Sequence, residues 1–278
     1  MPTATRAAPV IALLTDFGHR DHYAGVMKGV IARLAPRARM IDLTHAVAPQ
    51  SIVAGALALA QSWRYFPART IFLAVVDPGV GTARKPIAIE TRSGARFVGP
   101  DNGLLALAAA QAGIGRIVEL NAPRYRLSDV SSTFHGRDIF APAAAWLARG
   151  TSIRALGPAV DRLIALALPE PSMTNKLIRG EVIHVDGFGN LITNIGAVAV
   201  ATLSACFRGK PLSVRIGPSA AIKIYRAYGD APTGGPLATI GSFNLLEIAV
   251  RDASAALHYS AGAGTSVVVS IAPARHKD

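Results

Sequence analysis

Short apolar runs alternate with helical patterns through the first half of the chain, and few folds accommodate such an alternation. The first three runs cover residues 10–15, 38–44 and 70–76. Between them, residues 23–34 place apolar side chains at helical spacing, and Ser51 suits the N-cap of an alanine-rich helix that follows. Strands that alternate with helices predict an α/β domain with a mainly parallel sheet and helices on both faces.

The same alternation continues to residue 150. Further strands are expected at 86–90, 95–100 and 116–120, with a helix from about 102 to 112 between the last two. Another helix follows and is stopped by Gly150. Sheets of this kind bind ligands beyond the carboxyl ends of their strands. The polar residues at those ends are therefore candidates for a site.

The pattern changes after residue 165. Residues 166–176 hold two prolines and several polar residues, which suits a linker. Beyond it, residues 177–278 consist of short β-rich segments separated by turn residues. This spacing predicts a smaller, mainly antiparallel β domain or barrel. We therefore expect an α/β N-terminal domain over 1–165 and a β-rich C-terminal domain over 177–278.

Composition and charge narrow the class of protein. Hydrophobic residues make up 51% of the 278 and charged residues 17%, which excludes a disordered chain. No apolar run reaches the roughly 18–20 residues that span a bilayer, and the single Cys206 excludes an intramolecular disulfide. We expect a cytoplasmic protein that binds no membrane. The net charge of +12 comes from scattered arginines without basic runs or interleaved aromatics, so we expect no nucleic-acid partner.

A carboxylate and an arginine flank the turn that follows the third apolar run. Asp77 comes directly before Pro-Gly, and Arg84 follows seven residues later. Seen alone, this is equally a turn with an exposed arginine and a site. His135 lies in a loop just before a helix, where its ring can face a pocket. An aspartate, an arginine and a histidine on loops of one α/β domain can bind and polarise a water.

The loop after the first apolar run carries two aspartates and two histidines, namely Asp16, His19, Asp21 and His22. Imidazole and carboxylate groups suit a divalent metal, but the HExxH helix signature is missing. The alternative is that Asp16 accepts hydrogen bonds from ribose hydroxyls at a strand end, as acidic residues do in many nucleoside sites. Asp21 then pairs with a cationic group. We favour the alternative and expect no metal.

Residues 184–196 join two expected strands through an Asp-Gly turn. A hairpin is one interpretation of this segment. The other is a nucleoside contact, since an aromatic ring, Phe188, beside an amide, Asn190, provides what an adenine needs. No glycine-rich phosphate loop of the P-loop or Rossmann form occurs, so a nucleoside without phosphates fits better than ATP or NAD.

Six motifs in a fixed order give the chain a resemblance to a known family. They lie at residues 15–25, 77–84, 99–105, 133–145, 186–195 and 242–250. Over nearly its whole length the chain resembles the S-adenosyl-L-methionine hydrolases that form adenosine, also called SAM hydroxide adenosyltransferases. These are relatives of the fluorinase and chlorinase enzymes. The resemblance implies hydrolysis of S-adenosyl-L-methionine to adenosine and L-methionine, without a cofactor.

The resemblance also implies an assembly and roles for particular residues. The assembly is a homotrimer, with the ligand between one subunit's N-terminal domain and its neighbour's C-terminal domain. The attacking water is held by Asp77, Arg84 and His135. Asp16 matches the ribose contact. The methionine end matches Asp21, Asp186 and Ser242, and the nucleoside end matches Phe188, Asn190 and Tyr228. Two positions depart from the family pattern, Asn244 in place of glycine and Arg251 in place of asparagine.

Two alternative functions remain, a SAM-dependent halogenase and a non-catalytic adenosine- or SAM-binding protein. The sulfonium is already a good leaving group, so the chemical difficulty lies in activating the nucleophile. A halide-using relative would want a dry pocket of small donors without a carboxylate to repel the anion. The presence of Asp77, Arg84 and His135 therefore favours water over chloride or fluoride.

Overall fold

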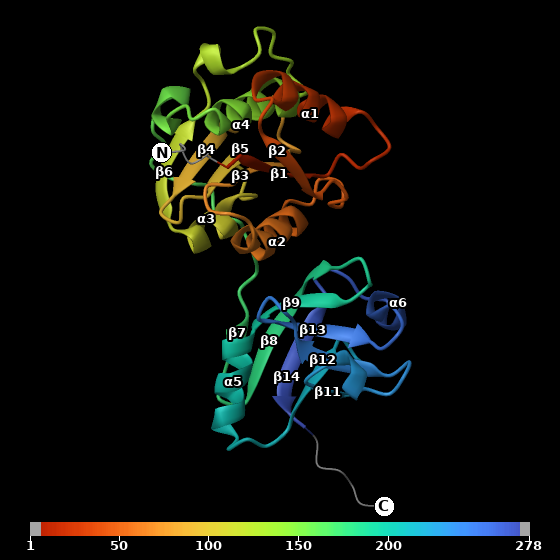
Figure 1. Ribbon diagram of the computed structural model, residues 1–278. Helices are drawn as coiled ribbons and strands as arrows, with labels where there is room; N and C mark the ends of the chain where they lie inside the picture. Colours follow the sequence, from red (N-terminus) through yellow and green to blue (C-terminus); the bar gives the residue numbers. More distant parts are fainter. Residues whose placement is uncertain (1–6, 273–278) are drawn as a thin grey trace, which may run out of the picture. The chain divides into compact units, whose positions relative to one another are not determined.

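The computed structural model describes residues 7–272, and the chain divides after Ala167 into two units (Figure 1). The first unit contains a six-stranded sheet in the order β2-β1-β3-β5-β4-β6. Its strands are β1 Val10–Thr15, β2 Arg39–Thr44, β3 Ile71–Val75, β4 Pro86–Thr91, β5 Arg96–Pro100 and β6 Ile114–Glu119. Neighbouring strands among β1, β2, β3 and β5 run parallel, whereas β4 pairs antiparallel with β5 and β6. The predicted mainly parallel sheet is confirmed.

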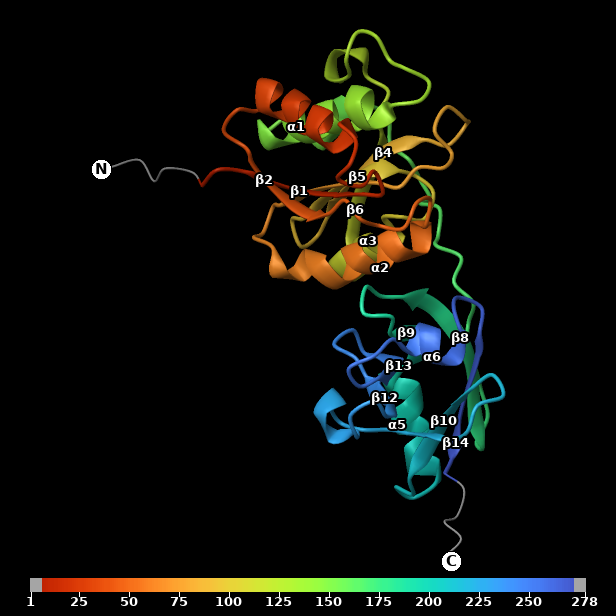
Figure 2. The same cartoon turned by 90° about the vertical axis from the view of Figure 1, so that its right-hand side faces the viewer.

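Helices cover both faces of this sheet, as Figures 1 and 2 show. One face carries α1 and α4, and the other carries α2 and α3. The helices are α1 Tyr23–Leu34, α2 Ile52–Ser62, α3 Ala106–Ala112 and α4 Ala141–Ala148. Shorter helical turns are η1 Trp63–Tyr65, η2 Pro123–Tyr125, the π-helix η3 Gly136–Phe140, and η4 Ile153–Leu156. The central strands are buried on both faces, which explains their continuous apolar runs.

The start of α2 was predicted correctly, and the start of α3 was not. Ser51 caps α2 as expected, since its hydroxyl oxygen accepts a hydrogen bond from Ala54 N at 3.3 Å. The expected helix start near Asn102 is wrong, because α3 begins only at Ala106. Gly103 has φ +96, and Asn102 Oδ1 accepts from Leu104 N, so these residues form a turn instead.

The second unit begins at Leu168 and contains an eight-stranded sheet. Its order is β11-β10-β14-β8-β9-β13-β12, with β7 paired to β8, and every strand pairing is antiparallel. The strands are β7 Ser172–Met173, β8 Leu177–Val185, β9 Leu191–Gly196, β10 Leu212–Ile216, β11 Ile222–Lys223, β12 Pro236–Ile240, β13 Leu245–Val250 and β14 Ser266–Ile271. The helical elements are α5 Ala197–Cys206, η5 Tyr228–Asp230 and α6 Ala255–Tyr259.

This second sheet curls toward closure. Strands β11 and β12 stand at opposite ends of the strand order, yet Ile224 bridges Ala238 just beyond β11. The curled sheet encloses its own apolar core, which includes Ile178, Val214 and Ile248. A barrel-like antiparallel unit is therefore confirmed.

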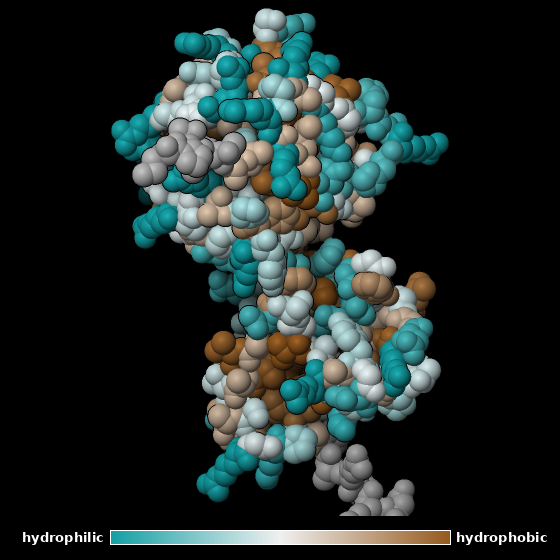
Figure 3. Space-filling view, viewed as in Figure 1, coloured by the Kyte–Doolittle hydropathy of each residue, from teal (hydrophilic) through white to brown (hydrophobic). Residues whose placement is uncertain are grey.

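Figure 3 shows polar and apolar side chains intermixed on the visible face of the first unit, and a group of apolar side chains on the visible face of the second unit near α5. Within residues 7–272, no helix is both long enough and apolar enough to cross a bilayer.

Candidate active site

The loop that carries Asp77 is fixed where it leaves the sheet. Strand β3 is buried throughout, and Asn102 Nδ2 donates a hydrogen bond to the carbonyl of Val76 at 2.9 Å, directly before the aspartate. Inside the loop, the Thr82 hydroxyl donates to Gly79 O at 2.7 Å. These bonds hold Asp77 at the carboxyl end of a central strand.

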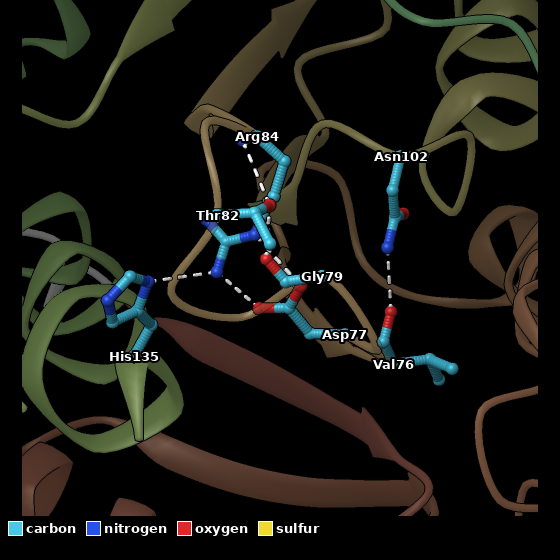
Figure 4. Close-up of polar contacts among 7 residues, drawn as sticks. All are labelled: Val76, Asp77, Gly79, Thr82, Arg84, Asn102 and His135. Atoms are coloured by element: carbon cyan, nitrogen blue, oxygen red, sulfur yellow. Dashed lines mark hydrogen bonds and ion pairs between the residues drawn. The ribbon is translucent and has the colours of Figure 1, made fainter. Parts of the chain in front are cut away.

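Arg84 folds back on this loop and joins Asp77 to His135, as Figure 4 shows. Its Nε donates to Asp77 Oδ1 at 2.8 Å, and its Nη2 contacts both Asp77 Oδ2 and His135 Nδ1, the latter at 2.9 Å. The side chains of Arg84 and Asp77 are only 8% and 6% exposed. The interpretation as a turn with an exposed arginine is therefore wrong, because both charges are buried and paired.

The contact with Arg84 fixes the protonation of His135. A guanidinium group only donates hydrogen bonds, so His135 Nδ1 must accept and the ring proton must sit on Nε2. Burial lowers the pKa of His135, and the positive charge of Arg84 lowers it further. His135 is therefore a neutral imidazole at neutral pH, with Nε2–H as a donor.

One donor of Arg84 has no partner among the residues that the structure describes. Its Nη1 is buried and makes no hydrogen bond within residues 7–272. The guanidinium carbon lies 5.2 Å from the ring centre of Phe140, a cation–π contact that holds it in place. A buried N–H without a partner is costly, so a small polar molecule beside this donor would be favoured, although Arg84 itself does not line the neighbouring cavity that Asp77 and His135 line.

A cavity of about 610 Å³ brings three of the predicted residues together. Asp16, Asp77 and His135 all line it, from the loops after β1 and β3 and the loop before η3. Asp16 is held in turn by Gln50, whose backbone N–H donates to Asp16 Oδ2 at 2.8 Å. The volume is in the range of sites that bind nucleoside-sized molecules.

An aromatic wall on this cavity was not predicted from the sequence. Phe17, Tyr23 and Phe134 line the cavity and contact one another, with ring centres 5.2–5.9 Å apart. Each aromatic residue is adjacent in the sequence to a candidate polar residue, namely Asp16, His22 or His135, and this adjacency could have indicated its place in the cavity. Apolar rings beside two carboxylates provide both the stacking surface and the polar contacts of a nucleoside site.

The four polar residues of the first loop do not form one cluster. Asp21 is exposed and lies outside the cavity lining, whereas Asp16 is part of it. His19 packs edge-on against His45, and His22 stacks on Tyr23. Over residues 7–272, no three His, Cys, Asp or Glu side chains are placed to share a metal ion.

In the second unit, Asp186 organises the turn between β8 and β9. Its Oδ1 accepts from Phe188 N and Asn190 N at 2.9 Å each, and its Oδ2 accepts from Asn190 Nδ2 at 3.0 Å. The hairpin interpretation of this segment is confirmed. The turn leaves the Phe188 side chain 84% exposed, so a large aromatic ring is free to contact a ligand.

Tyr228 and a residue missed by the sequence reasoning form a second polar group. The Tyr228 hydroxyl donates to Oε1 of Glu247, which is 6% exposed. Burial raises the pKa of both groups, and the Tyr228–Glu247 contact raises that of the tyrosine further. Ser242 is exposed in the turn between β12 and β13.

The two departures from the family pattern have local explanations. Asn244 has φ +59, a left-handed conformation that asparagine tolerates almost as glycine does. Arg251 Nη1 donates to Gly229 O at 3.0 Å and to Ala231 O at 2.7 Å, so it fastens the turn that carries Tyr228.

The sequence matches one family over both units. Residues 11–157 match the SAM hydroxide adenosyltransferase N-terminal domain, and residues 180–268 match the C-terminal domain of the same name. The chain is 43% identical over 253 residues to the (R)-S-adenosyl-L-methionine hydrolase of Salinispora arenicola, covering 90% of this chain and 93% of that protein. The hydrolase of the same name from Thermus thermophilus is 39% identical over 252 residues, with 88% and 93% covered.

More distant and structural relatives agree with this match. A fluorinase from an Actinoplanes species is 25% identical over 290 residues, covering 94% of this chain and 97% of that protein. The crystal structure of an uncharacterized conserved protein from Thermotoga maritima superposes with a TM-score of 0.86 at 38% identity. That superposition covers 94% of this chain and 99% of the other.

Proposed function

The chain belongs to the SAM hydroxide adenosyltransferase family and hydrolyses S-adenosyl-L-methionine, and we propose that Asp77, Arg84 and His135 hold the attacking water. The observation that carries this proposal is the buried Asp77–Arg84–His135 contact on a nucleoside-sized cavity. At that cavity the Asp77 carboxylate provides acceptors and His135 Nε2–H provides a donor, while Arg84, which does not line the cavity, holds the two side chains together.

The proposed reaction is an in-line displacement at C5′ of the substrate. A water oxygen forms a bond to C5′ while the C5′–S bond breaks, and that electron pair neutralises the sulfonium to the thioether of methionine. The water loses one proton, which Asp77 accepts and passes to solvent. Asp77 is the better acceptor because His135 Nδ1 already accepts from Arg84 and His135 Nε2 already carries a proton.

Arg84 contributes by stabilising the charge that develops on the water. Hydroxide character increases as the proton leaves, and a buried guanidinium favours it electrostatically. Holding the water in line with the breaking bond supplies up to about 7–11 kcal/mol of the barrier reduction. The sulfonium departs without acid catalysis, so the proposed step requires neither a metal nor a cofactor.

Substrate contacts follow the residues expected from the sequence. We propose that Asp16 binds the ribose hydroxyls, and that a homotrimer pairs the cavity with the second unit of a neighbouring subunit. That neighbour would supply the nucleoside contacts Phe188, Asn190 and Tyr228. It would also supply the methionine contacts Asp186 and Ser242. Asp21, which belongs to the first unit, would be a further methionine contact.

Sedimentation of the purified protein at a trimer mass supports this assembly, and a monomer that is fully active contradicts it. The cytoplasmic location stays a prediction.

The sulfonium centre raises the question of stereochemistry. Relatives at 43% and 39% identity are named (R)-S-adenosyl-L-methionine hydrolases. We propose that this chain also takes the (R) epimer. Inverting sulfur exchanges the methyl group and the methionine chain while C5′ stays in place, so the contacts to methionine decide the preference.

The direct test is incubation of each epimer with the enzyme in chloride buffer made with ¹⁸O-water, with products identified by mass. We expect L-methionine and adenosine that carries the label on its 5′-oxygen, formed faster from the (R) epimer. Only 5′-chloro-5′-deoxyadenosine would make the protein a halogenase. Tight binding of adenosine without turnover would make it a non-catalytic binding protein.

A further inference from the structure

A buried polar pair lies directly beneath the loop that carries Asp16. Thr15 ends β1 and is fully buried, and the His45 side chain, one residue beyond β2, is 1% exposed. The Thr15 hydroxyl oxygen lies 2.8 Å from His45 Nδ1. Neither residue lines the cavity, so the pair is not used by the mechanism above.

Backbone hydrogen bonds join the two loops on either side of this pair. Gly18 N donates to His45 O at 2.7 Å, and Val47 N donates to Thr15 O at 3.4 Å. Phe17 N donates to the Thr15 hydroxyl oxygen at 3.2 Å. Of the two residues that flank Asp16, Thr15 is therefore a member of the pair, and Phe17 is hydrogen-bonded to it.

The charges around His45 set the direction of its hydrogen bond. Its Nε2 lies 3.1 Å from Asp42 Oδ1, and Asp42 Oδ2 accepts from Lys28 Nζ of α1 at 2.6 Å. The Nε2–H is not aligned for a full hydrogen bond to the carboxylate, but the negative charge favours the proton on that nitrogen. Nδ1 is then the acceptor, and the Thr15 hydroxyl donates to it.

We propose that His45 is a positioning residue for substrate binding, acting through Thr15 on Asp16. This rests on the proposed role of Asp16 as the ribose contact. With Nδ1 as acceptor, the Thr15 hydroxyl points away from Phe17, so its oxygen lone pair receives the Phe17 N–H. That bond holds the backbone after Asp16, while Gln50 N holds the carboxylate itself. His45 thereby fixes the direction of the Asp16 side chain.

The test compares His45→Leu with His45→Asn by steady-state kinetics and by adenosine binding. Leucine removes both ring nitrogens, so we expect KM and the adenosine dissociation constant to rise roughly 5- to 10-fold, the range for one lost hydrogen bond. We expect kcat to stay within about 2- to 3-fold of the parent, since the water-holding residues are untouched. Asparagine returns an acceptor near the position of Nδ1 and should recover part of the lost affinity.

A second pair of variants covers the outcome that His45→Leu does not fold. Thr15→Val deletes the same hydrogen bond from its other side without changing side-chain volume much. Thr91→Val is the matched control, because Thr91 is also buried and its hydroxyl donates to Ala95 O at 2.7 Å in a hairpin that does not line the cavity. Both should lower stability, but only Thr15→Val should raise KM.

Combination with Asp16→Asn decides whether the effect passes through Asp16. If it does, His45→Leu or Thr15→Val should add less than about 2-fold to KM in that background. A full additional 5- to 10-fold rise would overturn the inference. Equal KM changes for Thr15→Val and Thr91→Val would overturn it as well. If Asp16→Asn alone left KM unchanged, the ribose role of Asp16 would fail instead, which separates the two ideas.

Discussion

Arg84 decides more about this site than any other single residue. It neutralises Asp77, it makes His135 a neutral Nε2–H donor, and it keeps one buried donor without a protein partner among the described residues. Lysine could not do this, because its compact ammonium lacks the planar fork that reaches two acceptors at fixed angles. The set works as one unit, so we expect its substitutions to combine non-additively.

The first prediction separates the role of Asp77 from that of Asp16. Asp77→Asn keeps the size of the side chain but removes the charge that accepts the water proton. Turnover should fall by roughly 10²–10⁴-fold with little change in KM. Asp16→Asn should mainly raise KM, as the loss of a ribose contact would. Steady-state kinetics of both variants give the comparison. An Asp77→Asn enzyme within a few-fold of the parent would contradict the assigned role.

The second prediction concerns the titration of His135. Its pKa should lie below the ordinary 6.5, because burial and the Arg84 charge both disfavour the protonated ring. Replacing Arg84 with methionine removes one of these causes and leaves the Asp77 charge, which acts in the opposite direction. NMR titration of the imidazole should therefore show a higher pKa in Arg84→Met than in the parent. An unchanged value would mean that the two side chains are not in contact in solution.

For single residues, the motifs and the family resemblance named Asp77, Arg84, His135 and Asp16 as candidates, because polar residues at the carboxyl ends of strands lie where such sheets bind ligands. The structure places Asp77, Arg84 and His135 in contact, and their functional roles stay predictions. This contact could not be predicted, since it depends on how the loop 77–84 folds back on itself. Glu247 was missed because a glutamate inside an apolar strand gives no local signal of a partner 19 residues away.

Two loops meet where the catalytic set forms, and their contact depends on one glycine. Gly81 has φ +78, and a Cβ at this position would lie 2.7 Å from Ser132 O. The loop after β3 can therefore approach the loop before η3 only because residue 81 has no side chain. The π-helix η3 follows His135 directly, and such wide turns are frequent at functional sites.

The third prediction follows from that close approach. Gly81→Ala should push the two loops apart and strain the backbone, lowering stability by about 1–2 kcal/mol. Turnover should fall up to roughly 10²-fold, since a displacement of about 1 Å spoils the alignment of Arg84 with His135. Gly29→Ala is the control, because Gly29 lies inside α1 with no atom near its Cβ position. It should raise stability by about 0.5–1 kcal/mol and leave turnover unchanged. Thermal unfolding and kinetics measure both.

The elements themselves were predictable where periodicity was strong. Residues 23–34 form α1 at the predicted bounds, because their apolar spacing is matched by a buried face. Helix α5 was not predicted, because its alternating alanines and valines do not form an apolar face in the sequence; in the structure only Val200 and Leu203 of this helix are buried. The antiparallel direction of β4 also depends on its partners β5 and β6 and not on its own residues.

For the whole molecule, the division into two units follows from each having a separate apolar core. Near residue 165 the pattern of alternating strands and helices gives way to short β-rich segments, and this change could be recognised from the sequence alone. The sequence left open whether the second sheet is an open antiparallel sheet or a barrel, because the bridge between Ile224 and Ala238 joins residues from opposite ends of the strand order. Nonlocal pairing of this kind is set by the packing of the complete unit.

The fourth prediction concerns stability in acid. Burial lowers the pKa of His45 and His135 in the first unit and of His184 in the second. When the pH is below about 6.5, a histidine whose pKa is lowered in the folded state binds fewer protons in the folded protein than in the unfolded one. The free energy of unfolding must therefore decrease as the pH is lowered through this range. Each such group contributes a slope of up to about 1.4 kcal/mol per pH unit until its folded pKa is reached. Burial raises the pKa of the carboxyls of Asp101 and Glu247, so these two groups act in the opposite sense, over a pH window that begins at their ordinary 3.8 and 4.5.

Urea unfolding at a series of pH values tests this prediction. The midpoint should be nearly constant from about pH 8 to about pH 7 and should decline from there toward about pH 5.5. His184→Gln removes one titrating group from the second unit alone. The urea midpoint of the second unit should therefore depend less on pH in this variant. The midpoint of the first unit should keep the pH dependence due to His45 and His135. A urea midpoint that increases as the pH is lowered from about 7 to about 5.5 would show that these histidines are not buried as neutral rings.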